Sequence, residues 1–231
     1  MNRPYTFINV AMTADGKIDT FERKGSAISS KRDKSRVDEL RAAADGILVG
    51  GRTLLDETPK LTVKSEALRE DRVRRGLSPN PVKVGVVTSV ANADIPLESD
   101  FIKAGPARVV IFTTNQTSKD KLAELTASGV EVFVHDAPRV DLNSMMQTLK
   151  KIGVDHLMVE GGGTMNFELM RLGLVDELML FVAPMIFGGA NAPTPADGTG
   201  LLRDAAVEMK LMDVEKWEDG GVLLRYKFFS S

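Results

Sequence analysis

Residues 157–170 read LMVEGGGTMNFELM: an apolar run, a glutamate, three consecutive glycines, a threonine and a helix-like segment. Glycine loses more backbone freedom on folding than any other residue, so three in a row are costly unless the backbone there must stay bare. A strand that ends in such a turn and continues into a helix is typical of α/β proteins, which bind ligands at the carboxyl ends of their strands. The stretch therefore indicates both a fold class and a binding site.

A second stretch, ILVGGRTLL (47–55), repeats this design of buried strand, glycines, threonine and expected helix. Without Cβ atoms, backbone amides can approach an anion, and the N-terminus of the following helix adds partial positive charge. Thr53 and Thr164 can cap these helices or offer hydroxyls to phosphate oxygens. The alternative is that each glycine cluster only forms a tight turn. The pattern is not a Rossmann fingerprint, because Asn166 stands where the third glycine should be. We favour a dinucleotide held between the two glycine turns.

Strands and helices alternate along the rest of the chain. Near-continuous apolar runs, typical of strands buried on both faces, occupy residues 82–89, 108–114 and 130–136. Further strands are predicted over residues 5–12, 46–51 and 156–160, and helices over residues 29–46, 65–75, 118–129 and 141–153. This alternation predicts an α/β fold around a mostly parallel central sheet.

The C-terminal part has a different pattern. Residues 175–189 and 207–228 read as long strands, and EDGG (218–221) predicts an antiparallel hairpin turn within the second stretch. Residues 191–200, NAPTPADGTG, read as a surface loop. We therefore expect a mixed sheet, with antiparallel C-terminal strands added to the α/β body.

Composition narrows the class of protein. The 231 residues are 43% hydrophobic and contain no linker-like tract, so we expect one domain over residues 1–231. A net charge of −2 with interspersed signs argues against nucleic acid or an anionic membrane as partner. There is no cysteine, and His135 and His156 have no ligand-like spacing, so we expect no metal site. No apolar run suits a signal peptide or a membrane span, so we expect a cytoplasmic protein.

Five motifs, in order along the chain, resemble the NADPH-dependent reductase of riboflavin biosynthesis. They are Asn9, ADGK (14–17), ISS (28–30), LVGGRTLLDETPKLTV (48–63) and MVEGGGTMNFELMRLGLVDEL (158–178). That enzyme occurs as the second domain of bifunctional deaminase–reductases and as a stand-alone protein. The resemblance implies a dihydrofolate-reductase-like three-layer fold, NADPH as cofactor, a phosphorylated pyrimidine as substrate and a homodimer.

The resemblance also implies site residues. For the cofactor these are Thr53, Glu57, Thr88, Ser89, Gly161, Gly162, Gly163 and Thr164, and for the substrate they are Asn9, Gly25, Ser29, Arg41, Leu61, Lys64 and Glu160. Cationic Arg41 and Lys64 suit a ribose 5′-phosphate, because charge-assisted hydrogen bonds to phosphate are strong. Either residue could equally be a solvated surface cation. The segment 56–59 departs from the family, which commonly has Asp-Asp-Pro or Asp-Asn-Pro where this chain has Asp-Glu-Thr-Pro.

Glu160 is the candidate catalytic residue, because a chain without cysteine leaves carboxylates as the available acid–base groups. It is expected to contact the pyrimidine or to stabilise a cationic imine; the alternative is a carboxylate that only caps nearby amides. The main hypothesis is reduction of 2,5-diamino-6-ribosylamino-4(3H)-pyrimidinone 5′-phosphate. Reduction of 5-amino-6-(5-phosphoribosylamino)uracil, of dihydrofolate or another pterin, and nucleotide sensing without catalysis remain alternatives. A cysteine-free chain cannot contain the zinc deaminase domain, which favours the stand-alone form.

Overall fold

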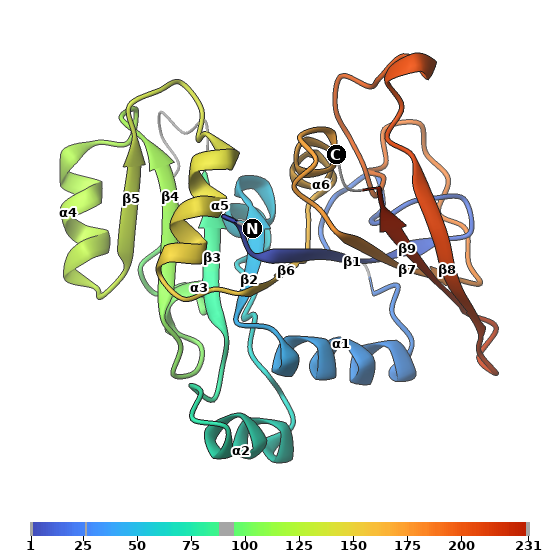
Figure 1. The fold of residues 1–231 in the computed structure, drawn as a ribbon, viewed down its shortest axis with the longest axis horizontal. Helices are drawn as coiled ribbons and strands as arrows, with labels where there is room; N and C mark the ends of the chain where they lie inside the picture. Colours follow the sequence, from blue (N-terminus) through green and yellow to red (C-terminus); the bar gives the residue numbers. More distant parts are fainter. Residues whose placement is uncertain (1, 26, 88–94, 230–231) are drawn as a thin grey trace. The chain divides into compact units, whose positions relative to one another are not determined.

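The computed structural model describes residues 2–25, 27–87 and 95–229 (Figure 1). The chain forms two compact units, each made of separate stretches of sequence. The first contains Asp38–Met158 and the N-terminal residues up to Pro4, and the second contains Tyr5–Val37 and Val159 onward. Helix α1 (Lys31–Ala43) and strand β6 (His156–Val159) each contribute residues to both units. No helix in the described ranges is long and apolar enough to cross a membrane.

Four parallel strands form the sheet of the first unit, in the order β5-β4-β3-β2 (Figure 1). They are β2 (Gly46–Gly50), β3 (Val82–Val86), β4 (Val109–Thr114) and β5 (Glu131–His135). Every residue of β2 and β4 is buried, as expected for strands covered on both faces. The same prediction is wrong for β5, whose Val134 is 46% exposed. β5 is an edge strand and pairs only with β4 among the described residues, so its other edge has no neighbouring strand.

The helices of the first unit are α2 (Glu66–Arg74), α3 (Asp100–Lys103), α4 (Lys119–Ala127) and α5 (Leu142–Lys151), together with the π-helix η1 (Thr53–Glu57). The ends of α5 and α4 carry residue types that are typical of helix termini. Asp141 caps α5 by accepting hydrogen bonds from the backbone N–H groups of Asn143 and Ser144. Gly129 follows α4 with a positive φ of 85°, the conformation that favours glycine after a helix. The short helix α3 was not predicted.

The second unit contains strands β1 (Tyr5–Thr13), β7 (Glu177–Ala183), β8 (Met209–Lys216) and β9 (Val222–Phe228), helix α6 (Gly163–Arg171) and the 3₁₀ turn η2 (Arg203–Ala205). Strands β1 and β7 are parallel, whereas β7–β9 and β8–β9 are antiparallel. The predicted C-terminal hairpin is confirmed, and so is the α/β class with a mixed, mostly parallel sheet. The expectation of a single domain over the whole chain stays a prediction.

A small core holds the hairpin to the start of α1 within the second unit. Its buried members are Ile28, Phe181, Ala183, Trp217 and Leu223. Phe181 and Trp217 stack with ring centroids 5.0 Å apart, and the guanidinium of Arg32 lies 4.4 Å from the Trp217 ring centroid. The contacts fix the segment that precedes α1, where Ser29 was predicted to meet substrate.

The loop over residues 191–200 differs from its prediction as a surface loop. Ala192 is 5% exposed and Pro193 is also buried. Asn166 of α6, which is fully buried, donates a hydrogen bond from Nδ2 to the Pro195 carbonyl at 2.9 Å. The first half of this loop is therefore packed against α6.

Candidate active site

The second glycine turn, residues 161–163, lies in the second unit between β6 and α6. Gly161 has φ +110°, a conformation that side-chain-bearing residues rarely adopt, and the peptide between Gly161 and Gly162 is cis. A Cβ placed on Gly161 would have no atom within 4 Å. Helix α6 starts with Gly162 at its N-cap and has no side-chain cap, so no capping side chain satisfies its first N–H groups. Bare backbone facing open space beside an uncapped helix N-terminus fits a phosphate group.

Close packing against the loop over residues 191–200 requires glycine at position 163. A Cβ on this residue would overlap the Thr194 carbonyl oxygen and lie 3.0 Å from Asp197 Oδ2. The Gly163 carbonyl accepts a hydrogen bond from the Asp197 backbone N–H at 3.0 Å. Asp197 Oδ1 in turn accepts from the Thr194 hydroxyl at 2.7 Å. The turn is thus backed on one side by the loop over residues 191–200.

Glu160 is the residue directly before these glycines, immediately after the last residue of β6, and it is half-buried. Thr164 is exposed in the first turn of α6, so its hydroxyl is accessible. Their placement at the carboxyl end of a strand agrees with a ligand-binding position, although the assigned roles remain predictions.

The first glycine turn lies in the first unit and has a different construction. A Cβ on Gly51 would lie 3.2 Å from the Val86 carbonyl oxygen and 3.5 Å from Val87 Cα. Glycine is therefore needed here for close approach of two strand ends. The helix expected after the turn is the five-residue π-helix η1, which begins at Thr53 and ends at Glu57. It is followed by Thr58 in a left-handed conformation, φ 41°.

Residues 61–65 of the first unit are fixed against α1. Both oxygens of the Asp38 carboxylate accept backbone hydrogen bonds, from Lys64 N at 2.6 Å and from Ser65 N at 2.8 Å. The Arg41 Nη1 group donates to the Thr62 carbonyl at 3.1 Å. Leu61 is buried in a left-handed conformation, φ 47°. The fold thus brings Arg41, Leu61 and Lys64 together, and Lys64 is exposed while its backbone is held.

The remaining predicted substrate residues belong to the second unit. Asn9 of β1 is 8% exposed, and its Oδ1 accepts a hydrogen bond from Arg36 Nη2 at 2.7 Å. Gly25 has φ +79° and donates its backbone N–H to Asp19 Oδ2 at 2.9 Å. Ser29 is half-buried. Thr88 and Ser89 lie outside the described residues. The family resemblance implies that they bind the adenosine 2′-phosphate of NADPH.

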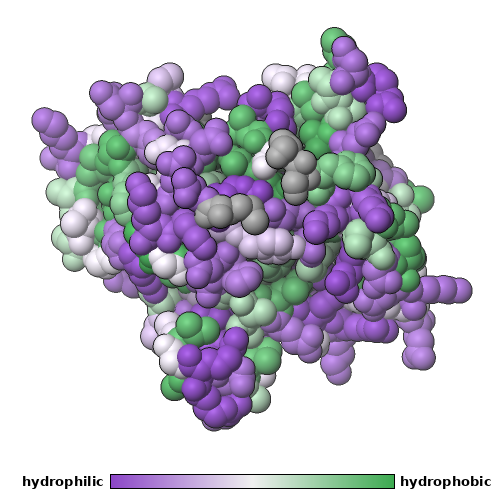
Figure 2. Space-filling model, in the orientation of Figure 1, coloured by the Kyte–Doolittle hydropathy of each residue, from purple (hydrophilic) through white to green (hydrophobic). Residues whose placement is uncertain are grey.

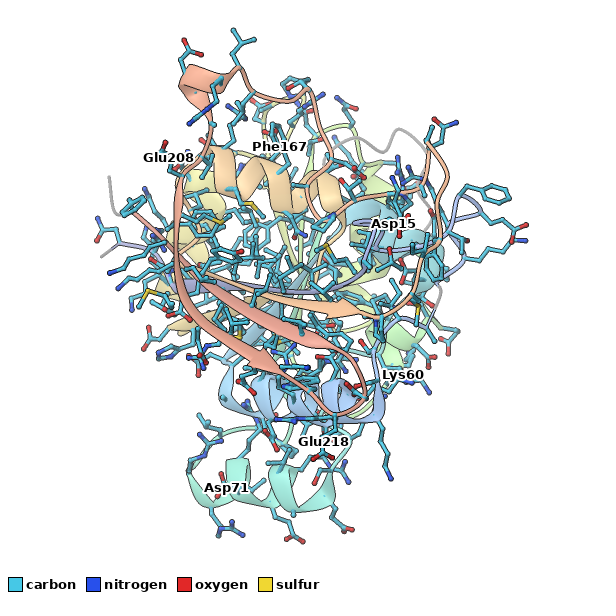
Figure 3. The ribbon with its side chains drawn as sticks, turned by 90° about the vertical axis from the view of Figure 1, so that its right-hand side faces the viewer. Asp15, Lys60, Asp71, Phe167, Glu208 and Glu218 are labelled. Carbon is cyan, nitrogen blue, oxygen red and sulfur yellow. The ribbon has the colours of Figure 1, made fainter. Side chains whose placement is uncertain are left out.

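The ADGK turn has a role that the sequence did not indicate. The Asp15 carboxylate accepts hydrogen bonds from the Thr13 hydroxyl at 2.5 Å, from Gly188 N at 2.7 Å and from Phe187 N at 3.2 Å. These bonds, that from Thr13 foremost, hold the pKa of the Asp15 carboxyl below its usual value. Asp15 therefore ties this turn to the loop that follows β7, and Figure 3 labels it beside that loop.

Two carboxylates on α1 were also missed: Asp38, which holds residues 64 and 65, and Asp33, which pairs with Arg36. Helical spacing offered a signal, because Asp33 and Arg36, and likewise Asp38 and Arg41, lie three residues apart and share a helix face. On this helix the family resemblance pointed to Arg41 and to neither of the two carboxylates.

Comparison with known proteins identifies the family. A family model described as the RibD C-terminal domain matches residues 4–223. The chain belongs to this family. A relative from Archaeoglobus fulgidus is 40% identical over 89% of this chain and 92% of its own length. Another, from Methanothermobacter thermautotrophicus, is 40% identical over 86% of each chain. Both relatives are named 2,5-diamino-6-ribosylamino-4(3H)-pyrimidinone 5′-phosphate reductase.

A solved structure supports the RibD C-terminal fold. A pyrimidine reductase-like protein from Corynebacterium diphtheriae superposes with a TM-score of 0.81, covering 100% of this chain and 94% of its own. The two sequences are 21% identical, so this likeness shows the shared fold alone. The expected membership in the reductase family of riboflavin biosynthesis is confirmed, together with its fold.

Proposed function

We propose that this protein uses NADPH to reduce the ribosyl group of 2,5-diamino-6-ribosylamino-4(3H)-pyrimidinone 5′-phosphate to the ribityl group, in riboflavin biosynthesis. The observation that carries the proposal is the name shared by two relatives, each 40% identical to this chain along most of both lengths. Uncapped amides at the start of α6 and open backbone at Gly161 support the binding of a cofactor phosphate.

The chemistry requires an opened sugar, because a closed ribosylamine has no acceptor for hydride. The C1′–O4′ bond breaks, an imine forms between C1′ and the ring-attached nitrogen, and O4′ takes up a proton. A bound nicotinamide cofactor would supply the hydride that adds at C1′. The protein's residues orient the substrate and support positive charge on the protonated imine. Glu160 is the carboxylate that we assign to this support.

The substrate phosphate is assigned to Lys64, assisted by Arg41. Lys64 is exposed, whereas its backbone N–H is bound to Asp38, so the ammonium group extends from a fixed point. Arg41 donates from Nη1 to the Thr62 carbonyl, which holds its guanidinium beside the Lys64 segment, and a guanidinium suits the charge of a phosphate. NADPH rather than NADH is proposed from the family resemblance at Thr88 and Ser89.

Oxidation of NADPH, followed by its near-ultraviolet absorbance, tests this function directly. The purified protein is given the pyrimidinone, its deaminated uracil counterpart or dihydrofolate, with NADH as the alternative cofactor. We expect turnover to be fastest with the pyrimidinone and NADPH. Faster turnover of the uracil compound or of dihydrofolate would assign the enzyme to that substrate instead, and NADPH binding without any turnover would indicate a sensor.

Lys64→Met tests the phosphate assignment. We expect the substrate KM to rise about tenfold or more, since a charge-assisted hydrogen bond contributes about 1.5–3 kcal/mol. Lys60→Met is the matched control, because Lys60 is an exposed neighbour whose ammonium lies 3.7 Å from Asp100 Oδ2. Equal KM values in the two variants would reject Lys64 as a phosphate ligand.

We propose that the second copy of a homodimer pairs along β8, the last strand of its sheet. Met209, Leu211, Met212 and Val214 of this strand are 37–55% exposed, and unpaired strand edges with apolar side chains favour association. Figure 2 shows hydrophobic residues among hydrophilic ones in the region where Figure 1 places β8. The same strand faces the viewer in Figure 3. Sedimentation of Leu211→Glu beside the wild-type protein tests this; an unchanged dimer would place the contact elsewhere.

A further inference from the structure

A buried polar cluster in the second unit joins α1 to β1. Arg36 donates to Asp33 Oδ1 from Nε at 3.1 Å and from Nη2 at 2.7 Å. The same Nη2 group donates to Asn9 Oδ1 at 2.7 Å, and Nη1 lies 3.8 Å from the sulfur of Met179. The Asp33 side chain is 1% exposed and that of Arg36 is 15% exposed. Met179 is paired with Asn9 across strands β1 and β7, so the cluster lies over the middle of these strands.

This arrangement determines which end of the Asn9 amide faces Arg36. A guanidinium has only donors, so the group that meets it must be the amide oxygen and not the nitrogen. The nitrogen, Nδ2, therefore points away from the cluster. Among the described residues Nδ2 has no hydrogen-bond partner, yet it is not one of the fully buried polar atoms that lack one. A donor is thus left accessible at a residue that is otherwise buried.

The cluster holds Arg36 in one orientation. The Oδ2 atom of Asp33 is buried and has no hydrogen-bond partner among the described residues, where the hydrogen bonds to this carboxylate come from Arg36. Burial strengthens the attraction between the two charges, since few water molecules screen it. A guanidinium fixed in this way can hold the amide of Asn9 without the freedom that an exposed arginine would have.

We infer that Arg36, aligned by Asp33, is a positioning residue that fixes Asn9 so that its Nδ2 N–H donates a hydrogen bond to an acceptor on the bound heterocycle. The matching group is a ring carbonyl oxygen or an unprotonated ring nitrogen. The identity of this ligand as a pyrimidinone rests on the proposed function. The orientation of the amide rests on the geometry of the cluster.

A double-mutant cycle with Arg36→Met and Asn9→Ala tests the inference. We expect each single change to raise the substrate KM about three- to tenfold with a smaller change in kcat, the range of one hydrogen bond. If Arg36 acts through Asn9, adding Arg36→Met to the Asn9→Ala variant raises KM less than twofold further, because contacting residues are not additive. Fully additive effects would overturn the inference, and thermal melting confirms that each variant is folded.

Two further variants sharpen the test. Asn9→Asp keeps an acceptor toward Arg36 but replaces the outward donor by an acceptor, so KM should rise more than in Asn9→Ala. Lys34→Met is the matched control on the same helix, because Lys34 is an exposed cation two residues from Arg36 and is expected to leave KM unchanged. A KM for Asn9→Asp equal to that of the wild type would show that Nδ2 donates to no ligand.

A measurement without ligand separates this inference from the proposed function. The side-chain ¹⁵N–¹H signals of Asn9, assigned by their loss in Asn9→Asp, should shift or broaden in Arg36→Met and stay unchanged in Lys34→Met. Unchanged signals in Arg36→Met would overturn the inference whatever the substrate is. Absence of turnover by the wild-type enzyme with every pyrimidine, together with the expected signal changes, would refute the proposed function and keep the positioning role of Arg36.

Discussion

The two glycine turns start from the same sequence design and use their glycines for different reasons. In the first turn, the position before the glycines is the buried apolar Val49, and a Cβ on Gly51 would lie in tight contact, 3.2 Å from the Val86 carbonyl oxygen of β3. In the second turn, that position is the half-buried Glu160, and a Cβ on the buried Gly161 would have no atom within 4 Å. The first turn leads into a short π-helix, whereas the second leads into an uncapped α-helix.

This difference shows that a glycine motif does not by itself indicate a ligand. The same residue type serves close packing at Gly51 and Gly163 and a free backbone at Gly161. Of the two turns, the second combines a carboxylate, room for a Cβ at Gly161 and a helix N-terminus without a side-chain cap, so we expect it to be the more sensitive to substitution in assays of function. The following predictions test the comparison, from the largest expected effect to the smallest.

Gly163→Ala should cause the largest loss of stability, about 3 kcal/mol, because the new methyl group would overlap a backbone carbonyl that cannot move freely. Chemical denaturation measures this loss. Gly46→Ala is the control, since its methyl would meet the Val154 Cγ1 atom at 3.1 Å and a side chain can shift. Equal losses in both variants would mean that the loop behind the second turn yields easily.

Glu160→Gln should lower kcat/KM about 100-fold, the lower end of the effect of a positioned acid–base group. Steady-state kinetics at saturating NADPH measure it. Glu168→Gln on α6 is the control, because Glu168 pairs with Arg171 through a 2.6 Å contact on the same helix. Unchanged kcat and KM in Glu160→Gln would leave this carboxylate without a part in the reaction.

Gly161→Ala should cost about 1–2 kcal/mol of stability through backbone strain alone, since its φ is positive and the space for a Cβ is open. Gly129→Ala shares both properties and should cost a similar amount. NADPH titration then separates the two variants: we expect weaker binding in Gly161→Ala alone. Equal affinities would remove the second turn from the cofactor site.

Gly51→Ala should cost about 1 kcal/mol, because a Cβ at 3.2 Å from the Val86 carbonyl forces a small shift between β2 and β3. Thermal unfolding measures the loss, and NADPH titration of the same variant shows what it does to binding. We expect a smaller effect on NADPH affinity than in Gly161→Ala. The opposite order of affinities would reverse the comparison between the turns.

The last prediction concerns how the unfolding free energy depends on pH, which we expect to change least near neutral pH. It involves Lys83, the second residue of β3, the strand that supports the first turn. Burial lowers the pKa of Lys83 from 10.5 to about 8, against a smaller opposing effect of Asp100. Its ammonium group donates to the Phe101 and Ala104 carbonyls at 3.0 and 2.6 Å. Between pH 8 and 10.5 the unfolded state binds more protons, so this group makes the unfolding free energy rise with pH and lowers it as pH falls through 8.

Lys83→Met should remove this part of the pH dependence, measured by denaturant unfolding at several pH values from 7 to 11. Lys103→Met is the control, because Lys103 is an exposed residue of α3, the helix that contains Phe101. Identical pH profiles for the wild type and Lys83→Met would show that the buried lysine keeps its ordinary pKa.

Much of the fold could be predicted because the signals are local. The eight stretches predicted as strands cover the nine strands of the described residues, because the last stretch, residues 207–228, forms the hairpin of β8 and β9. The exposure of β5 could not be predicted, because a strand's own residues do not say whether a second neighbour covers it. The packing of the first half of the loop over residues 191–200 depends on α6, a partner distant in sequence.

The candidate site was predictable to a lesser degree. The residues suggested by the resemblance could be named, and Arg41, Leu61 and Lys64 do lie together. The residues that hold them could not be named, because Asp38 acts on a backbone segment 26 residues away. The π-helix after the first turn was likewise missed, since nothing in TLLDE distinguishes it from an ordinary helix turn.

By itself, the sequence determined the α/β class, the C-terminal hairpin and the positions of the two glycine turns, because these depend on hydrophobic periodicity and on residues close along the chain. The tertiary structure alone decided what each glycine is for, which end of the Asn9 amide is free and how Lys64 is held. Those properties depend on contacts such as Gly163 with Thr194 and Asn9 with Arg36, which form only when packing brings distant segments together.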